Sequence, residues 1–124
     1  MSAVARFLLA SGAIVMALAV VGGAMSAHGV KAAVHPEAGR LLQTAVLYAL
    51  LHGLGVIILG VLARTAASQW LVVSGALLLA GTVLFCGSLA WLAMTGRSLG
   101  MVAPAGGLAF IAGWVTLAVY AILP

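Results

Sequence analysis

The chain has 124 residues, of which 5% are charged and 66% are hydrophobic, and its formal net charge is +4. Soluble domains carry about 25% charged residues, so the six charged side chains of this chain cannot cover a water-facing surface. The composition also excludes a disordered protein, and the scattered basic residues exclude the clustered cations of a nucleic-acid-binding surface. We therefore expect the lipid bilayer to be the main solvent of the chain.

Four apolar runs without Asp, Glu, Lys or Arg predict the membrane-spanning segments. They cover residues 7–27, 41–63, 70–95 and 101–123. Each reaches the length of about 20 residues that a helix needs to cross the hydrocarbon core, and lipid satisfies no backbone groups outside helices or closed barrels. With flanking residues, we expect helices at about 6–28, 36–63, 70–95 and 103–123. Short loops between them predict a single all-α membrane domain over residues 1–124, a four-transmembrane-helix up-down bundle.

The first apolar run has an alternative interpretation as a secretory signal peptide. Arg6 precedes it, and Ala24-Met25-Ser26 near its end resembles a cleavage site. A signal core has about 7–15 residues, whereas this run has 21. We favour a retained span that closes at Gly29. The cations divide two against three between the two sides, which by the positive-inside rule favours both termini outside.

The later helices carry start and stop signals. Pro36-Glu37 predicts the start of the second helix, where Glu37 could pair with Arg40 three residues on. Gly96 closes the third helix, which is long enough that we expect it to be tilted or frayed at one end. Pro104 suits the first turn of the fourth helix. The aromatic residues Trp70, Trp91, Trp114 and Tyr120 are interpreted as anchors at the membrane interfaces.

Small residues at helical spacing predict seams where helices pack closely, as in other membrane bundles. A seven-residue repeat in the third helix and four-residue repeats in the second and fourth define these seams. We interpret most of them as contacts within the bundle, and one of them as a candidate surface for another protein. The residues concerned are Ser74, Gly81, Ser88 and Thr95, then Ala105, Ala109 and Gly113, and then Ala49 and Gly53.

The candidate functional face is a polar row in the second helix, formed by Thr44, Tyr48 and His52 at a spacing of four. His52 lies about 16 Å along the helix from residue 41, near the middle of the bilayer, where ionisable residues are rare. It could serve a proton relay or bind a ligand. The structural interpretation, which we favour, is a neutral imidazole that hydrogen-bonds across the bundle to Ser88 or to a backbone carbonyl.

The remaining candidate groups predict no catalytic site, metal site or cofactor. His28 ends the first helix at the interface, His35 lies in the following loop, and neither accompanies His52 at its depth, so we expect no haem. The single Cys86 lies in an apolar run and is interpreted as a packing residue. A bound lipid remains compatible with the sequence.

Four stretches together resemble a known family. They are residues 23–29, which end the first helix with Ala-His-Gly, residues 44–52 of the second helix, residues 87–96 at the end of the third, and residues 104–114 of the fourth. Their order and spacing resemble the domain of unknown function 423 family of small bacterial membrane proteins, relatives of the eukaryotic transmembrane protein 256. The resemblance implies four helices in a bacterial inner (cytoplasmic) membrane, and it implies no activity, cofactor or partner.

The sequence therefore predicts a membrane protein that is not an enzyme. The leading hypothesis is an accessory or structural subunit that packs against a larger integral-membrane complex. A second hypothesis is a homo-oligomeric transporter or channel for ions or small solutes that uses the face of Thr44, Tyr48 and His52. A third is a membrane enzyme or haem protein, for which the sequence offers the least support.

Overall fold

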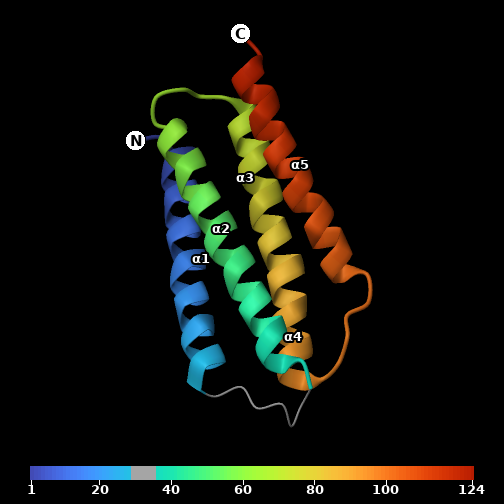
Figure 1. Cartoon of the computed structure of the whole chain (residues 1–124). Coiled ribbons are helices and arrows are strands. Elements are labelled where there is room, and N and C mark those ends of the chain that lie inside the picture. The colour runs from blue at the N-terminus through green and yellow to red at the C-terminus, as the bar shows by residue number, and fades with distance from the viewer. Residues whose placement is uncertain (29–35) are drawn as a thin grey trace.

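A computed structural model describes residues 1–28 and 36–124, and all the regular secondary structure of this part is helical (Figure 1). The helices are α1 (Ala3–His28), α2 (Ala38–Leu62), α3 (Gln69–Gly81), the π-helical segment η1 (Thr82–Cys86), α4 (Gly87–Thr95) and α5 (Val102–Ile122). The segments α3, η1 and α4 follow one another without a break, so they form one span. Within the described residues, four spans are long and apolar enough to cross a membrane, and they run up and down in turn (Figure 1). The predicted four-helix up-down bundle is thus confirmed.

The ends of the helices follow local capping chemistry. Helix α1 begins three residues before the expected Arg6, because the backbone N–H of Ala5 donates to the Ser2 hydroxyl at 3.1 Å. At the start of α3, the N–H of Trp70 donates to the Ser68 hydroxyl at 3.2 Å. Gly96 ends α4 with a φ of 72°, a left-handed conformation that favours glycine. The expected closure at Gly29 lies outside the described residues.

The third span has an irregularity that the sequence analysis does not predict. It contains the π-helical segment η1 in its interior. The two halves on either side of it have different neighbours. Helix α3 packs mainly on α5, whereas α4 packs mainly on α2 and contacts α5 little. One membrane crossing therefore packs on two different helices, with the π turn between the two contacts.

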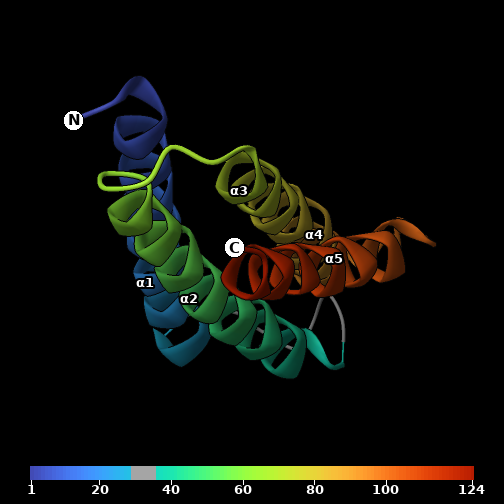
Figure 2. The same cartoon turned by 90° about the horizontal axis from the view of Figure 1, so that it is seen from above.

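Helix α2 occupies the centre of the bundle, with α1 on one side and the pair α3–α5 on the other (Figure 2). The backbones of α1 and α2 approach closely where glycines face each other. A Cβ atom on Gly12 would lie 2.9 Å from the carbonyl oxygen of Gly53, and one on Gly60 would lie 2.9 Å from the nitrogen of Leu9. Such close approach is how helices associate in lipid, which supplies no hydrophobic drive between them.

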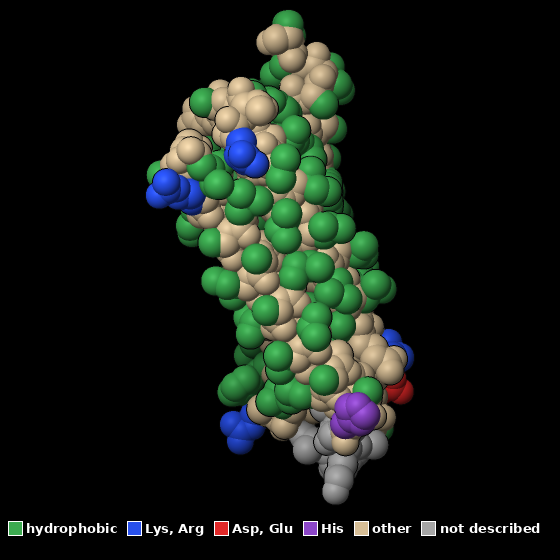
Figure 3. Space-filling model, turned by 90° about the vertical axis from the view of Figure 1, so that its left-hand side faces the viewer, with side chains coloured by type: hydrophobic (Ala, Val, Ile, Leu, Met, Phe, Trp, Pro, Cys, Tyr) green, Lys and Arg blue, Asp and Glu red, His purple; other side chains and the backbone are tan. Residues whose placement is uncertain are grey.

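The surface of the bundle matches a bilayer environment. On the face shown in Figure 3, the Lys and Arg atoms lie towards the two ends of the molecule, and hydrophobic and uncharged atoms cover the band between them. At one end, Arg40 forms an ion pair with Glu37, as the sequence predicts. Large apolar side chains such as Phe7, Leu18 and Val20 of α1 face outward. Lipid therefore covers the middle of the molecule.

Candidate functional site

The polar row on α2 does not form one common polar surface. Thr44 is half-buried, and its hydroxyl donates to the carbonyl oxygen of Arg40 on the same helix at 3.0 Å. Tyr48 is 37% exposed, whereas His52 is only 6% exposed. Only the last two of the three side chains meet, through stacked rings.

The imidazole of His52 is held by its own helix and by α5. Its Nδ1 lies 2.7 Å from the carbonyl oxygen of Tyr48. Because a carbonyl can only accept, Nδ1 carries the hydrogen, and Nε2 of the neutral ring carries the lone pair. The ring also stacks on Phe110, with centroids 3.5 Å apart and planes 15° apart. The expected hydrogen bond across the bundle is therefore replaced by a bond within α2.

His52 belongs to an aromatic cluster that links three elements. The aromatic cluster consists of Tyr48 and His52 of α2, Phe85 of η1, and Phe110 and Trp114 of α5. The ring centroids of Tyr48 and Phe85 are 4.6 Å apart, those of Phe85 and Phe110 are 5.7 Å apart, and those of His52 and Trp114 are 5.8 Å apart. Aromatic pairs contribute about 0.5–1.5 kcal/mol each beyond the burial of their surface. The cluster therefore stabilises the packing of α5 on the central helix α2.

The sequence contains a signal for this cluster. Phe110 and Trp114 are four residues apart, as Tyr48 and His52 are, and this spacing places each pair on one face of its helix. The two faces meet where α2 packs on α5. Trp114 contacts His52 well inside its span, and it lies against Gly55 as well. Its interpretation as an interface anchor is therefore corrected.

The π-helical segment adjoins the aromatic cluster and supplies Phe85. Two hydroxyl groups bind carbonyl oxygens beside it: Thr82 donates to Leu78 at 2.9 Å, and Ser88 donates to Phe85 at 3.0 Å. Ser88 therefore binds its own helix and not His52. Single π turns within α-helices occur frequently at functional sites, which makes this region the candidate functional site of the bundle.

The packing seams lie partly where the sequence places them. Ser74, Gly81 and Ser88 are buried, and the Ser74 hydroxyl crosses from α3 to α5 to donate to the carbonyl oxygen of Gly113 at 2.8 Å. Thr95, the last member of that repeat, is exposed and donates to Trp91 of its own helix at 2.7 Å. On α2, both Ala49 and Gly53 are buried.

On α5, the buried face is displaced from the expected seam. It runs through Gly106, Phe110 and Gly113, whereas Ala105 is exposed and Ala109 is half-buried. A Cβ atom on Gly81 of α3 would lie 2.5 Å from Cδ1 of Phe110, so the glycine makes room for that ring. The aromatic ring thus sets which face of α5 points inward.

His28, the other histidine among the described residues, does not join the site. His28 is exposed at the end of α1, and His35 lies outside the described residues. In residues 1–28 and 36–124, His, Cys, Asp and Glu side chains form no group of three that could hold a metal ion. Cys86 is buried at the end of the π-helical segment.

The chain is similar to a protein family and to several bacterial membrane proteins. The family described as protein of unknown function (DUF423) matches residues 22–107. The chain is 42% identical over 109 residues to the UPF0382 membrane protein SH2409 of Staphylococcus haemolyticus, which covers 86% of this chain and 87% of that protein. It is 38% identical over 113 residues to the UPF0382 membrane protein YwdK of Bacillus subtilis, with 90% and 92% covered.

A third relative is the UPF0382 inner membrane protein YgdD of Escherichia coli K12, at 36% identity over 118 residues, with 94% of this chain and 90% of that protein covered. No solved structure matches the chain. The expected placement as a multi-pass protein of a bacterial inner membrane is confirmed by these relatives together with the four apolar spans.

Proposed function

We propose that this chain, which belongs to the DUF423 family of small membrane proteins, is an accessory subunit that packs against a larger integral-membrane protein. The observation that carries the proposal is a groove between α1 and α4, whose floor is formed by α2. Because α1 packs almost entirely on α2, the two outer elements α1 and α4 stand apart with α2 between them.

The groove has a volume of about 380 Å³ and an apolar lining from α1, α2, η1 and α4. Thr82 contributes a hydroxyl, but that group already donates to Leu78. Small residues make up much of the lining: Ala19, Gly22, Ala45, Ala49, Gly87 and Ala90.

These small residues favour a transmembrane helix of another protein as the occupant. Backbones approach each other where side chains are small, and packing is then the main source of association in lipid. Gly87 is exposed, and a Cβ atom there would meet nothing within 4 Å. By contrast, neighbouring side chains already occupy the space beside inward glycines such as Gly53.

Site-specific photocrosslinking in the native membrane tests the proposal. Val83 lines the groove and is 71% exposed, so a photoreactive residue there should give a discrete adduct with a larger membrane protein. Leu108 on α5 is 67% exposed and lies outside the groove, and it serves as the matched control position. If Val83 gives no protein adduct beyond that seen at Leu108, the groove does not hold a partner.

A pair of glycine substitutions tests the same contact by co-purification. Gly87→Phe should fill the groove and release the partner. Gly107→Phe places the same ring at a glycine that also has nothing within 4 Å of a Cβ atom, but on α5. Equal retention of the partner by both variants would argue against docking in the groove.

The transport alternative has less support in this structure. It requires a water-accessible path along Thr44, Tyr48 and His52. The His52 side chain is 6% exposed, stacked on Phe110 and bonded to its own helix. The accessory role is therefore the function that the geometry favours.

A further inference from the structure

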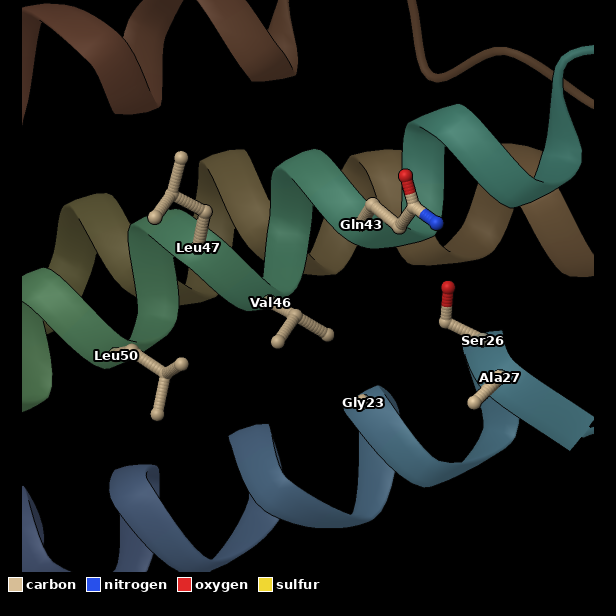
Figure 4. Close-up of a pocket in the computed structure, with 7 residues that line it drawn as sticks. All are labelled: Gly23, Ser26, Ala27, Gln43, Val46, Leu47 and Leu50. Atoms are coloured by element: carbon tan, nitrogen blue, oxygen red, sulfur yellow. The ribbon is translucent and has the colours of Figure 1, made fainter.

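A second pocket lies between α1 and α2, and it shares Val46 with the groove described above. Its volume is about 320 Å³, and it is lined by Gly23, Ser26 and Ala27 of α1 and by Gln43, Val46, Leu47 and Leu50 of α2. Figure 4 shows that the polar side chains of Ser26 and Gln43 lie together at one end of the pocket, and that Leu47 and Leu50 lie farther along α2. The pocket is therefore polar at one end and apolar at the other.

The polar end offers hydrogen-bond donors that the protein does not use. The hydroxyl oxygen of Ser26 is buried and has no hydrogen-bond partner among the described residues. A buried hydroxyl without a partner is unfavourable, and rotation about its Cα–Cβ bond can turn it into the pocket. Gln43 is exposed, and its amide can donate two further hydrogens. A single hydrogen-bond acceptor in the pocket would satisfy both the Ser26 hydroxyl and the Gln43 amide hydrogens.

The depth of the pocket in the membrane indicates the source of that acceptor. Ser26 is two residues from the end of α1, and Gln43 is five residues after the first residue of α2. At about 1.5 Å per residue, both lie within roughly 3–8 Å of the helix ends. Helix α2 has 25 residues and exceeds a hydrocarbon core of about 30 Å by roughly 7 Å in total. The polar end is thus at the hydrocarbon boundary, and Leu50 lies about 10 Å deeper than Gln43.

We propose that this pocket is a binding site for one glycerophospholipid. An ester carbonyl of the lipid accepts hydrogen bonds from Ser26 and Gln43, and one acyl chain lies along Val46, Leu47 and Leu50. Ester carbonyls are acceptors without donors, which matches the unused donors of the polar end. The acyl chain matches the apolar remainder of the pocket and runs along α2 into the membrane. The proposal does not rest on the accessory role, because Val46 alone lines both this pocket and the groove.

Native mass spectrometry of the full chain, delipidated in mild detergent and titrated with palmitoyl-oleoyl phosphatidylethanolamine, tests the site. The wild-type chain should bind a first lipid with an affinity distinct from later ones. Ala27→Phe should weaken that first binding about tenfold or more, because the ring overfills the pocket. Ala24→Phe is the matched control, since Ala24 is exposed on the same helix outside the pocket lining and should bind as the wild type does.

The contact with the ester group is tested with the ether-linked analogue of the same lipid, which lacks the carbonyl oxygens. Ser26→Ala should weaken binding of the ester lipid about 3-fold, the effect of one typical intramembrane hydrogen bond, and should leave binding of the ether lipid unchanged. Ser11→Ala, which removes a hydroxyl of α1 that already donates to Leu8, should change neither.

Two results would overturn the proposal. One is equal first-lipid binding by Ala27→Phe and Ala24→Phe, since the pocket would then not hold the lipid. The other is an equal effect of Ser26→Ala on the ester and ether lipids, since the hydroxyl would then not meet a carbonyl.

Discussion

The close approach of α1 and α2 at Gly12 makes the substitution Gly12→Ala a sharp test of the packing. A Cβ atom there would lie 2.9 Å from both the oxygen of Gly53 and the nitrogen of Ile57, which are backbone atoms that no rotamer change can move. To restore an ordinary contact of 3.4 Å, the two helices must separate locally by about 0.5 Å. Overpacking of this kind costs about 1–3 kcal/mol.

The matched control for this substitution is Gly107→Ala, at a helical glycine where a Cβ atom meets nothing within 4 Å. Both variants gain the same helix propensity of about 1 kcal/mol, so their difference reports the clash. We expect the free energy of unfolding of Gly12→Ala to be about 2 kcal/mol below that of Gly107→Ala, or about 30-fold in the ratio of folded to unfolded protein.

Unfolding in mixed micelles with increasing fractions of sodium dodecyl sulfate, followed by tryptophan fluorescence, measures both variants under the same conditions. A circular dichroism spectrum of each variant before titration checks that helix content is unchanged. If Gly12→Ala is as stable as Gly107→Ala, the backbones of α1 and α2 are not in the contact described.

Three further predictions concern the interior of the bundle. Ser74→Ala removes the hydroxyl that binds Gly113 across two helices and should lower the free energy of unfolding by about 0.6 kcal/mol, and by no more than about 1.7; an unchanged value in the same titration would contradict a contribution from this bond. His52→Leu removes a hydrogen bond and the stacking on Phe110, and we expect a loss of about 1 kcal/mol; stability equal to the wild type would show that only the volume of the side chain matters. Deletion of Val83 would remove the extra residue of the π turn and leave a regular α turn, with α3 and α4 facing their present neighbours, so cysteine crosslinks between α4 and α2 and between α3 and α5 should both remain; loss of the first set would contradict an extra residue at this turn.

The spans could be predicted from the sequence because charges are rare and their positions separate four long apolar runs. The direction of each helix then follows from the short connections. The π-helical segment could not be predicted, since the residues Thr82–Cys86 have an ordinary apolar composition and the extra residue in the turn depends on packing against α2 and α5.

The details of the site depend on tertiary contacts for the same reason. On α5, small residues occur at both Ala105 and Gly106, so a spacing of four fits two adjacent faces equally well. The ring of Phe110 selects the second face by stacking on His52, and the spacing of residues along the sequence does not determine which rings meet. Likewise, the His52 ring can reach a carbonyl of its own helix or a group across the bundle, and stacking on Phe110 favours the former.

The order of contacts along the chain has a consequence for biogenesis. Helix α1 finds its main partner in α2, and α3 finds its main partner in α5, with α2 joining the two pairs. When spans enter the membrane in the order of synthesis, the first hairpin can assemble while the rest of the chain is still on the ribosome. The second hairpin then closes onto a completed surface. Contacts between spans that are neighbours in sequence also need little loop closure. The last helix can therefore pack without any rearrangement of the first hairpin.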